Sequence, residues 1–132
     1  MRIGALAQRS GVSASTIRYY ESIDLLADPE RSPAGYRDYD VDAVERLRFI
    51  RDAQAWGLTL DEVQTLLSLK DAGAGTCSHT IAFLDRHVAE IDEQIERLRV
   101  ARTELHDLAE RARRLDPSTC TDPNRCQVID AS

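Results

Sequence analysis

The chain has 132 residues, of which 17 are basic and 23 acidic, so its formal net charge at pH 7 is −6. No apolar run approaches the roughly 18 residues that cross a bilayer, and the first residues become polar too early for a signal peptide. We therefore expect a cytoplasmic protein with reduced thiols and no membrane partner. The negative total does not exclude nucleic acid as a partner, because it does not locate a basic face.

The first part of the chain has the outline of a helix-turn-helix. Ile3 and Leu6 lie at helical spacing and predict a short first helix, which the turn "SGVS" ends. A second helix is predicted over residues 14–22, with Ser13 as its N-cap. Two short helices joined by a tight turn with glycine are typical of this motif.

Residues 26–40 predict a short hairpin or wing, because two prolines and Gly35 exclude a helix there. Tyr36 and Tyr39 flank Arg37 in this segment and favour strand structure over a plain linker. Two further helices are predicted after it. The first ends near Gly57, and the second begins with a capping box in "TLDE".

A long helix is predicted from residue 78, because neither glycine nor proline occurs between residues 78 and 116. Its apolar residues recur mostly three and four apart and form a heptad seam that Arg102 interrupts. Such a helix of about 37 residues is about 55 Å long. It could pack on its own domain, but that domain is too small to cover the seam. We therefore expect a second copy of the chain to cover it in a homodimer.

The predicted second helix has polar, basic and aromatic side chains in its first two turns, where a recognition helix meets the major groove. Its candidate DNA contacts are Ser15, Thr16, Arg18, Tyr19 and Tyr20. The hairpin adds Arg31, Tyr36 and Arg37 as candidate phosphate contacts. The basic face also includes Arg46, Arg48 and Arg51. In the alternative interpretation, Ile17 and one of the two tyrosines are core residues and the arginines are merely solvated.

The segments "TIRYYES", "AGYRDY" and "VERLRFIRDAQAWGLTLDEVQTLL" follow one another in this order. Together they resemble the MerR family of bacterial transcription regulators, over residues 2 to about 70 and on into the long helix. The resemblance implies a mainly α fold, with a winged helix-turn-helix DNA-binding domain, a long antiparallel coiled-coil dimerisation helix and a C-terminal metal-binding loop. The expected bounds are residues 1–70 for the DNA-binding domain, 71–77 for a linker, 78–115 for the helix and 116–132 for the loop. The family's typical DNA-contacting positions correspond to Arg18, Tyr19, Tyr20, Tyr36 and Arg37.

Three cysteines, an odd number, fit a disulfide framework poorly. Cys120 and Cys126 flank "TDPNR", a sequence that favours a tight turn and can bring both sulfurs to one cation. Cys77 lies at or just before the start of the long helix, where the helix dipole favours a thiolate. Two thiolates alone suit copper(I) or gold(I), whereas three suit a divalent thiophilic ion.

Cys77 cannot reach the tail of its own chain. The helix separates it from Asp116 by about 55 Å, and the residues from there to Cys120 span at most about 17 Å. In an antiparallel pair of helices, the start of one lies beside the end of the other. We therefore expect two shared sites per dimer, each formed by Cys77 of one protomer and by Cys120 and Cys126 of the other.

The family resemblance implies which metal is sensed. Branches that sense divalent ions have a cysteine at the start of the dimer helix, the copper(I)-sensing branch has a serine there, and the superoxide-sensing branch has four cysteines. The expected effector is therefore zinc, cadmium, lead or mercury, and three thiolates favour the last three. His79, two residues from Cys77, is a candidate fourth ligand of a tetrahedral site, although a lone surface histidine is more often solvated.

We therefore expect a metal-responsive transcription regulator that binds a pseudo-palindromic site in double-stranded promoter DNA. As the family implies, it would distort a poorly spaced promoter so that RNA polymerase can use it. One alternative keeps the DNA role and makes the cysteines a redox switch. Another is a cytosolic metal buffer or chaperone without specific DNA binding. An enzyme is not expected, because no nucleophile triad, phosphate-binding glycine loop or paired-carboxylate cleft is legible.

Overall fold

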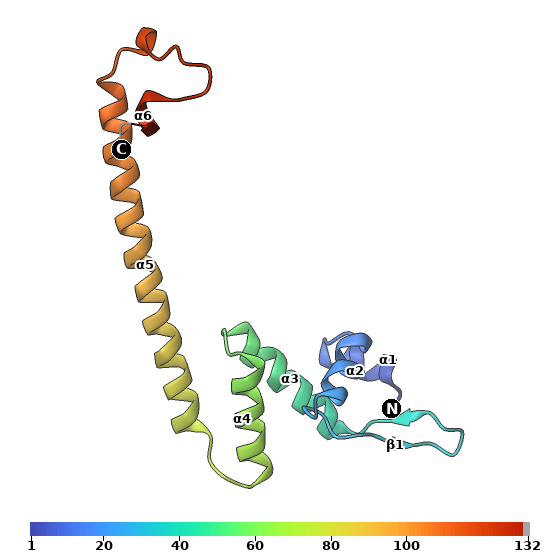
Figure 1. Cartoon of the computed structure of the whole chain (residues 1–132). Helices are drawn as coiled ribbons and strands as arrows, with labels where there is room; N and C mark the ends of the chain where they lie inside the picture. Colours follow the sequence, from blue (N-terminus) through green and yellow to red (C-terminus); the bar gives the residue numbers. More distant parts are fainter. Residues whose placement is uncertain (131–132) are drawn as a thin grey trace. The chain divides into compact units, whose positions relative to one another are not determined.

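The computed structural model describes residues 1–130 and is mainly helical, as expected (Figure 1). It divides into two compact units, Met1–His87 and Val88–Ser132, and the division falls within one long helix. The elements in chain order are α1 (Ile3–Ser10), α2 (Ala14–Ser22), β1 (Glu30–Arg31), β2 (Arg37–Asp38), α3 (Val41–Ala55), α4 (Leu60–Asp71), α5 (Cys77–Arg113), a 3-10 helix η1 (Pro117–Thr119) and α6 (Gln127–Asp130).

Helices α1 and α2 and the turn between them form the predicted helix-turn-helix. The turn is closed by Gly11, whose φ of 75° lies in the left-handed region and whose N–H donates to the Ala7 carbonyl at 3.0 Å. A Cβ at this position would displace the guanidinium of Arg51, and the left-handed φ itself favours glycine. Ser13 is the N-cap of α2, as predicted, and accepts a hydrogen bond from the Thr16 N–H at 3.2 Å.

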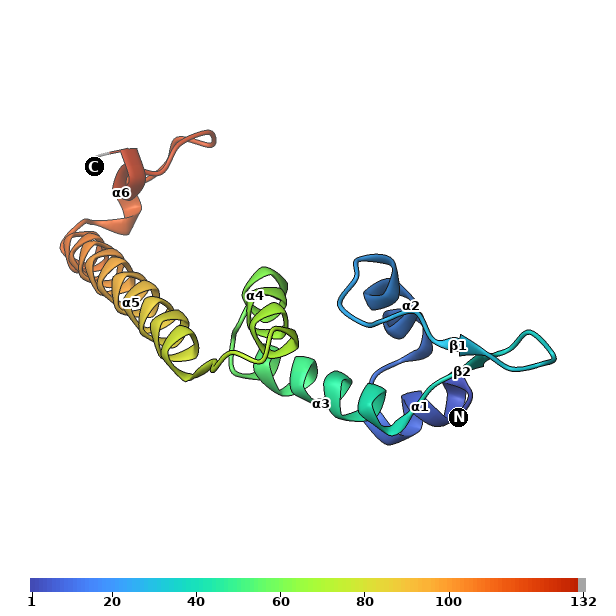
Figure 2. The ribbon, with the colours of Figure 1, turned by 90° about the horizontal axis from the view of Figure 1, so that it is seen from below.

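The predicted wing is a two-stranded antiparallel hairpin that protrudes beyond α1 and α2 (Figure 2). Its register pairs Glu30 with Asp38 and Arg31 with Arg37. The turn closes through a hydrogen bond from the Gly35 N–H to the Ser32 carbonyl at 2.8 Å. Gly35 has a φ of 85°, which explains why the predicted turn uses glycine.

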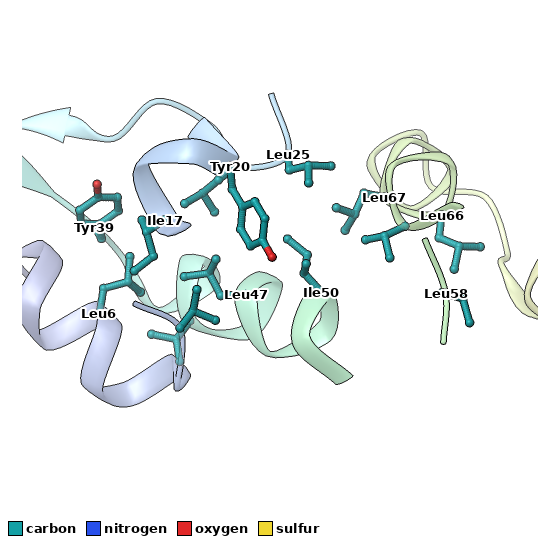
Figure 3. Packing of buried hydrophobic residues seen from close by; sticks show 14 residues of the cluster. Leu6, Ile17, Tyr20, Leu25, Tyr39, Leu47, Ile50, Leu58, Leu66 and Leu67 are labelled. Carbon is teal, nitrogen blue, oxygen red and sulfur yellow. The ribbon is translucent and has the colours of Figure 1, made fainter. Parts of the chain in front are cut away.

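The hydrophobic core lies among α1, α2, α3 and α4, and Figure 3 shows its side chains pointing toward one another. Leu6 from α1, Ile17 from α2, and Leu47 and Ile50 from α3 have no exposed surface. Burying such side chains stabilises the fold by about 1.5–3 kcal/mol each. The core therefore fixes which face of α2 remains exposed.

Helix α4 begins with the predicted capping box. The Glu62 N–H donates to Oγ1 of Thr59 at 3.2 Å, and the Thr59 N–H donates to Oε1 of Glu62 at 2.9 Å. The turn before it contains Trp56, the C-cap residue of α3, whose side chain is 82% exposed.

Helix α5 is continuous over 37 residues, and none of the residues within Cys77–Arg113 is buried in the single chain. It begins one residue earlier than predicted, so Cys77 is its first residue. The predicted apolar seam is exposed along its length: Ile81, Leu84, Val88, Ile91, Ile95, Leu98 and Leu105. Among the described residues, no helix is long and apolar enough to span a membrane.

Candidate DNA interface and metal centre

The exposed face of α2 presents Ser15, Arg18 and Tyr19, and Thr16 is half-buried beside them. Hydroxyl groups gather at the start of this helix, where Ser13 donates to Oγ1 of Thr16 at 2.8 Å. The first turn of α2 contains no acidic residue. The positive end of the helix dipole and these hydroxyls therefore form a surface suited to an anion such as a backbone phosphate.

Tyr20 does not belong to this surface, and its predicted DNA contact needs correction. Its side chain is only 6% exposed, whereas that of Tyr19 is 52% exposed. The Tyr20 hydroxyl donates to Oε1 of Gln54 at 3.0 Å, and burial raises the pKa of the phenol. Ile17 is also fully buried. The alternative that assigned Ile17 and one tyrosine to the core is therefore correct for these two residues.

The hairpin brings two arginines face to face, because Arg31 and Arg37 are cross-strand partners. The Glu21 carboxylate beside Arg37 offsets the repulsion between these like charges. Arg31 donates to the Gly35 carbonyl at 3.2 Å, so its guanidinium is held on the hairpin. Tyr36 is 53% exposed, and the guanidinium of Arg2 lies 4.1 Å from its ring centroid. This arrangement gives the hairpin a basic and aromatic surface.

Arg2 was not among the DNA-contacting residues that the sequence predicted. A single arginine before the first helix has no distinguishing pattern in the sequence, and only the folded hairpin brings it to Tyr36.

A buried carboxylate joins the hairpin to α2. Glu21 is 8% exposed, accepts a hydrogen bond from the Tyr39 hydroxyl, and lies 3.3 Å from Nε of Arg37. Burial, together with the hydrogen bond to Glu21, raises the pKa of Tyr39 to about 12. The hydroxyl therefore stays protonated and donating at physiological pH. These contacts fix the hairpin against the helix that presents Arg18 and Tyr19.

The three arginines of α3, which were predicted to add to the basic face, also form contacts within the chain. Nε of Arg46 donates to the Leu25 carbonyl at 2.7 Å, Nη2 of Arg48 to the Arg9 carbonyl at 3.0 Å, and Nη1 of Arg51 to the Ser10 carbonyl at 3.1 Å. Arg46 also forms an ion pair with Asp71 at 2.8 Å. Their contacts satisfy carbonyl groups at the ends of α1 and in the loop after α2, which is a structural role.

Cys120 and Cys126 are exposed thiols that the C-terminal loop brings close together. The N–H groups of Ile129 and Val128, and then the thiol of Cys120, lower the pKa of Cys126. The predicted turn between the two cysteines is present, with the Asn124 N–H donating to Oδ1 of Asp122 at 2.9 Å. The loop therefore favours the thiolate form that binds soft metal ions.

The thiol ligands that one chain brings together are enough for only part of a site for a divalent thiophilic metal ion. Within residues 1–130, no group of three or more His, Cys, Asp or Glu side chains is gathered where it could hold a metal ion. Cys77 is exposed as the first residue of α5, and His79 is exposed in the same turn. A single chain thus offers two adjacent thiols, which suffice for a linear site. A divalent ion with three thiolate ligands needs one more donor from outside this loop.

The chain is similar to known regulators over most of its length. The sequence profile of the MerR HTH family of regulatory proteins matches residues 1–70, and a profile described as "MerR, DNA binding" matches residues 44–108. The mercuric resistance operon regulatory protein of Bacillus cereus is 41% identical over 110 residues, which cover 83% of each chain.

Two crystal structures of metal complexes share the fold. The transcription regulator PbrR691 from Ralstonia metallidurans CH34, in complex with lead(II), is 35% identical, with a TM-score of 0.77 over 99% of this chain and 98% of that one. The regulator MerR from Bacillus megaterium MB1, in complex with mercury(II), is 36% identical, with a TM-score of 0.64 over the same shares of the two chains.

Proposed function

Because the chain belongs to the MerR family of helix-turn-helix regulatory proteins, we propose that it is a homodimer that binds promoter DNA and responds to a divalent thiophilic metal ion. Members of this family are regulators rather than enzymes, in agreement with the sequence. The proposal depends above all on the two adjacent thiols of the C-terminal loop, together with a third thiol at the start of α5.

Promoter DNA is proposed to contact the exposed face of α2 and the hairpin. The residues assigned to this contact are Ser15, Thr16, Arg18, Tyr19, Arg31, Tyr36 and Arg37. The exposure of Arg18 and Tyr19, the absence of acidic residues from the first turn of α2 and the exposed Tyr36 beside Arg2 support this assignment. A two-fold dimer would place one α2 in each half of a pseudo-palindromic site.

The partner proposed for the α5 seam is a second copy of α5 in an antiparallel coiled coil. The seam repeats at heptad spacing and remains exposed in the single chain, with Ile91 53% and Leu98 70% exposed. A contiguous apolar surface of this kind is covered by another protein surface in a stable molecule. The repeat of three and four residues is the pattern that another α-helix matches.

The metal site is proposed to be shared between protomers. Helix α5 separates Cys77 from Arg113 by about 55 Å at 1.5 Å per residue, whereas the seven residues from Arg113 to Cys120 extend at most about 25 Å. An antiparallel partner would bring its own Cys77 to Cys120 and Cys126 of the first chain. When bound, a cadmium, lead, mercury or zinc ion would join these thiolates, and His79 is the candidate fourth ligand.

The response is proposed to act on DNA shape. Each α2 and hairpin would hold its own half-site by phosphate and base contacts, so that a change in the spacing of the two domains bends or twists the DNA between them. RNA polymerase would then use a promoter whose elements are otherwise poorly spaced. On this proposal, the protein binds its DNA with and without metal, and transcription rises only with metal.

A heterodimer experiment tests the shared site. Subunits with Cys77→Ser are mixed with subunits that contain both Cys120→Ser and Cys126→Ser, and cadmium binding is followed by thiolate-to-cadmium charge-transfer absorbance. One intact site is expected per verified heterodimer and none in either parent homodimer. Absence of cadmium binding in the heterodimer would favour sites built within one protomer.

Two alternatives are separated by simpler measurements. A redox switch loses its response to cadmium under strong reductant, whereas a metal sensor keeps it. A metal buffer or chaperone enriches no particular sequence from a random pool of DNA duplexes, whereas a regulator does.

A further inference from the structure

Glu62 is a buried carboxylate that contacts two helices at once. Its side chain is 5% exposed in the first turn of α4. Oε1 accepts the Thr59 N–H at 2.9 Å and lies 2.7 Å from Nε2 of His87, and Oε2 forms an ion pair with the Arg86 guanidinium. Arg86 and His87 belong to the third turn of α5. One carboxylate therefore holds both the start of α4 and the N-terminal part of α5.

This contact is ionic at physiological pH. Burial by itself raises the pKa of Glu62, but the Thr59 N–H, the His87 ring and the Arg86 guanidinium outweigh that effect and lower the pKa to about 2. A buried carboxylate that loses its partners leaves an uncompensated charge in the protein interior, which is strongly unfavourable. The contact between α4 and α5 thus resists separation, and a displacement of one helix tends to move the other.

The α5 side of the contact lies on the same continuous helix that begins with Cys77. Thr80, Phe83 and His87 are spaced by three and four, so they form one stripe along the helix, whereas Arg86 lies on the face opposite Cys77. Phe83 in this stripe packs against the core of the DNA-binding unit, and the Arg86 guanidinium lies 5.4 Å from its ring centroid. Cys77 and His87 are about 15 Å apart along the helix axis at 1.5 Å per residue.

We propose that Glu62 is the positioning residue through which a change at Cys77 reaches the DNA-binding domain. The assignment of Cys77 as a metal ligand is part of the proposed function, and this inference rests on it. A shift of the N-terminal part of α5 would pull on Glu62 through Arg86 and His87. Because α4 begins at the same carboxylate and buries Leu66 and Leu67 in the core, α4 would pass the shift to the core around α2 and α3.

Thermodynamic linkage gives a test that does not depend on transcription. If cadmium and DNA are coupled, a bound duplex changes the affinity for cadmium by the same factor as cadmium changes the affinity for the duplex, typically about 5–150-fold. The affinity for cadmium chloride is measured from charge-transfer absorbance, with and without a duplex that the wild-type protein selected from a random pool. The ratio of the two affinities is the coupling factor.

Two variants remove the contact from either side. Glu62→Gln keeps the length of the side chain and its hydrogen bond to Thr59 but removes the charge, and Arg86→Met removes the exposed cationic partner. Both are expected to bring the coupling factor to within about twofold of one. Cadmium affinity without DNA and duplex affinity without cadmium should stay at the wild-type level.

Two matched controls keep the contact. Asp61→Asn removes a charge from the same turn of α4, and Arg86→Lys keeps a cation opposite Glu62. Both should retain the wild-type coupling factor.

A wild-type coupling factor in both Glu62→Gln and Arg86→Met would overturn this inference while leaving the proposed function intact. If Glu62→Gln does not fold, the comparison of Arg86→Met with Arg86→Lys tests the inference instead. Equal losses of metal-free duplex affinity in Arg86→Met and Arg86→Lys would indicate a structural role only and would also overturn it. A wild-type coupling factor of one would overturn this inference, because cadmium and the duplex would then not affect each other's affinity. The proposed function would still stand if cadmium raises transcription from the bound duplex, and it would fail if transcription does not respond to cadmium.

Discussion

Residues 1–87 and residues 88–130 differ in where their apolar side chains lie. The first unit buries fourteen hydrophobic side chains in one core, so its fold is closed by contacts within the chain. The second unit has most of the regular apolar seam of α5, from Val88 onward, which no described residue buries. The comparison indicates that contacts within the chain close the first unit, whereas the proposed partner helix would cover the seam of the second.

Substitution within the seam of α5 should have the largest effect on free energy, and it should weaken the dimer without unfolding the first unit. A charge at Ile91, as in Ile91→Glu, would be buried without a partner in the proposed coiled coil. We expect a cost of about 4 kcal/mol, or about a thousandfold in the dimer dissociation constant. Sedimentation equilibrium measures the dissociation constant, and circular dichroism checks that the first unit stays folded.

The matched control for this substitution is Thr103→Glu, which adds the same charge at an exposed position away from the seam. It should leave the dimer unchanged. Equal weakening by both variants would indicate a general charge effect and would contradict the proposed seam.

The two adjacent tyrosines of α2 should separate stability from DNA binding. Tyr20→Phe removes the hydrogen bond to Gln54, and we expect a loss of about 1 kcal/mol in unfolding free energy with unchanged duplex affinity. Tyr19→Phe removes an exposed hydroxyl, and we expect unchanged stability with about tenfold weaker duplex binding. Urea denaturation and fluorescence anisotropy measure the two quantities. The reverse pattern would return Tyr20 to the DNA surface.

Acid should also weaken the first unit, and the sign of this effect follows from the pKa of Glu62. The folded value of about 2 lies below the ordinary value of 4.5, so this carboxylate stabilises the first unit fully above pH 4.5 and loses its contribution as the pH falls toward 2. Glu62→Gln should therefore flatten the dependence of unfolding free energy on pH over that range. Urea denaturation between pH 5 and pH 2.5 tests this, and identical slopes for the two proteins would contradict it.

Local patterns were sufficient to predict the helix-turn-helix, the Ser13 cap, the capping box of Thr59 and Glu62, and the hairpin. Each depends on residues within a few positions of one another, such as the glycine that a left-handed turn requires at Gly11. The long helix was predicted for the same reason, because its heptad pattern is visible without any tertiary contact.

Contacts between residues far apart in the sequence could not be predicted from it. Adjacent tyrosines on a helix point about 100° apart, so spacing alone does not tell which of Tyr19 and Tyr20 enters the core. The arginines of α3 looked like a basic surface, and only the fold brings Arg48 and Arg51 to the carbonyls that end α1. The second role of Glu62, beyond its cap, depends on partners 24 and 25 positions away.

Trp56 gives this protein a built-in optical probe. It is the only tryptophan in the sequence, and it lies 82% exposed at the turn between α3 and α4, three residues before the capping box. Its emission in the folded protein should already be that of a solvated indole, so unfolding will scarcely move the maximum. A shift toward the blue would instead signal that another surface has covered this corner of the molecule.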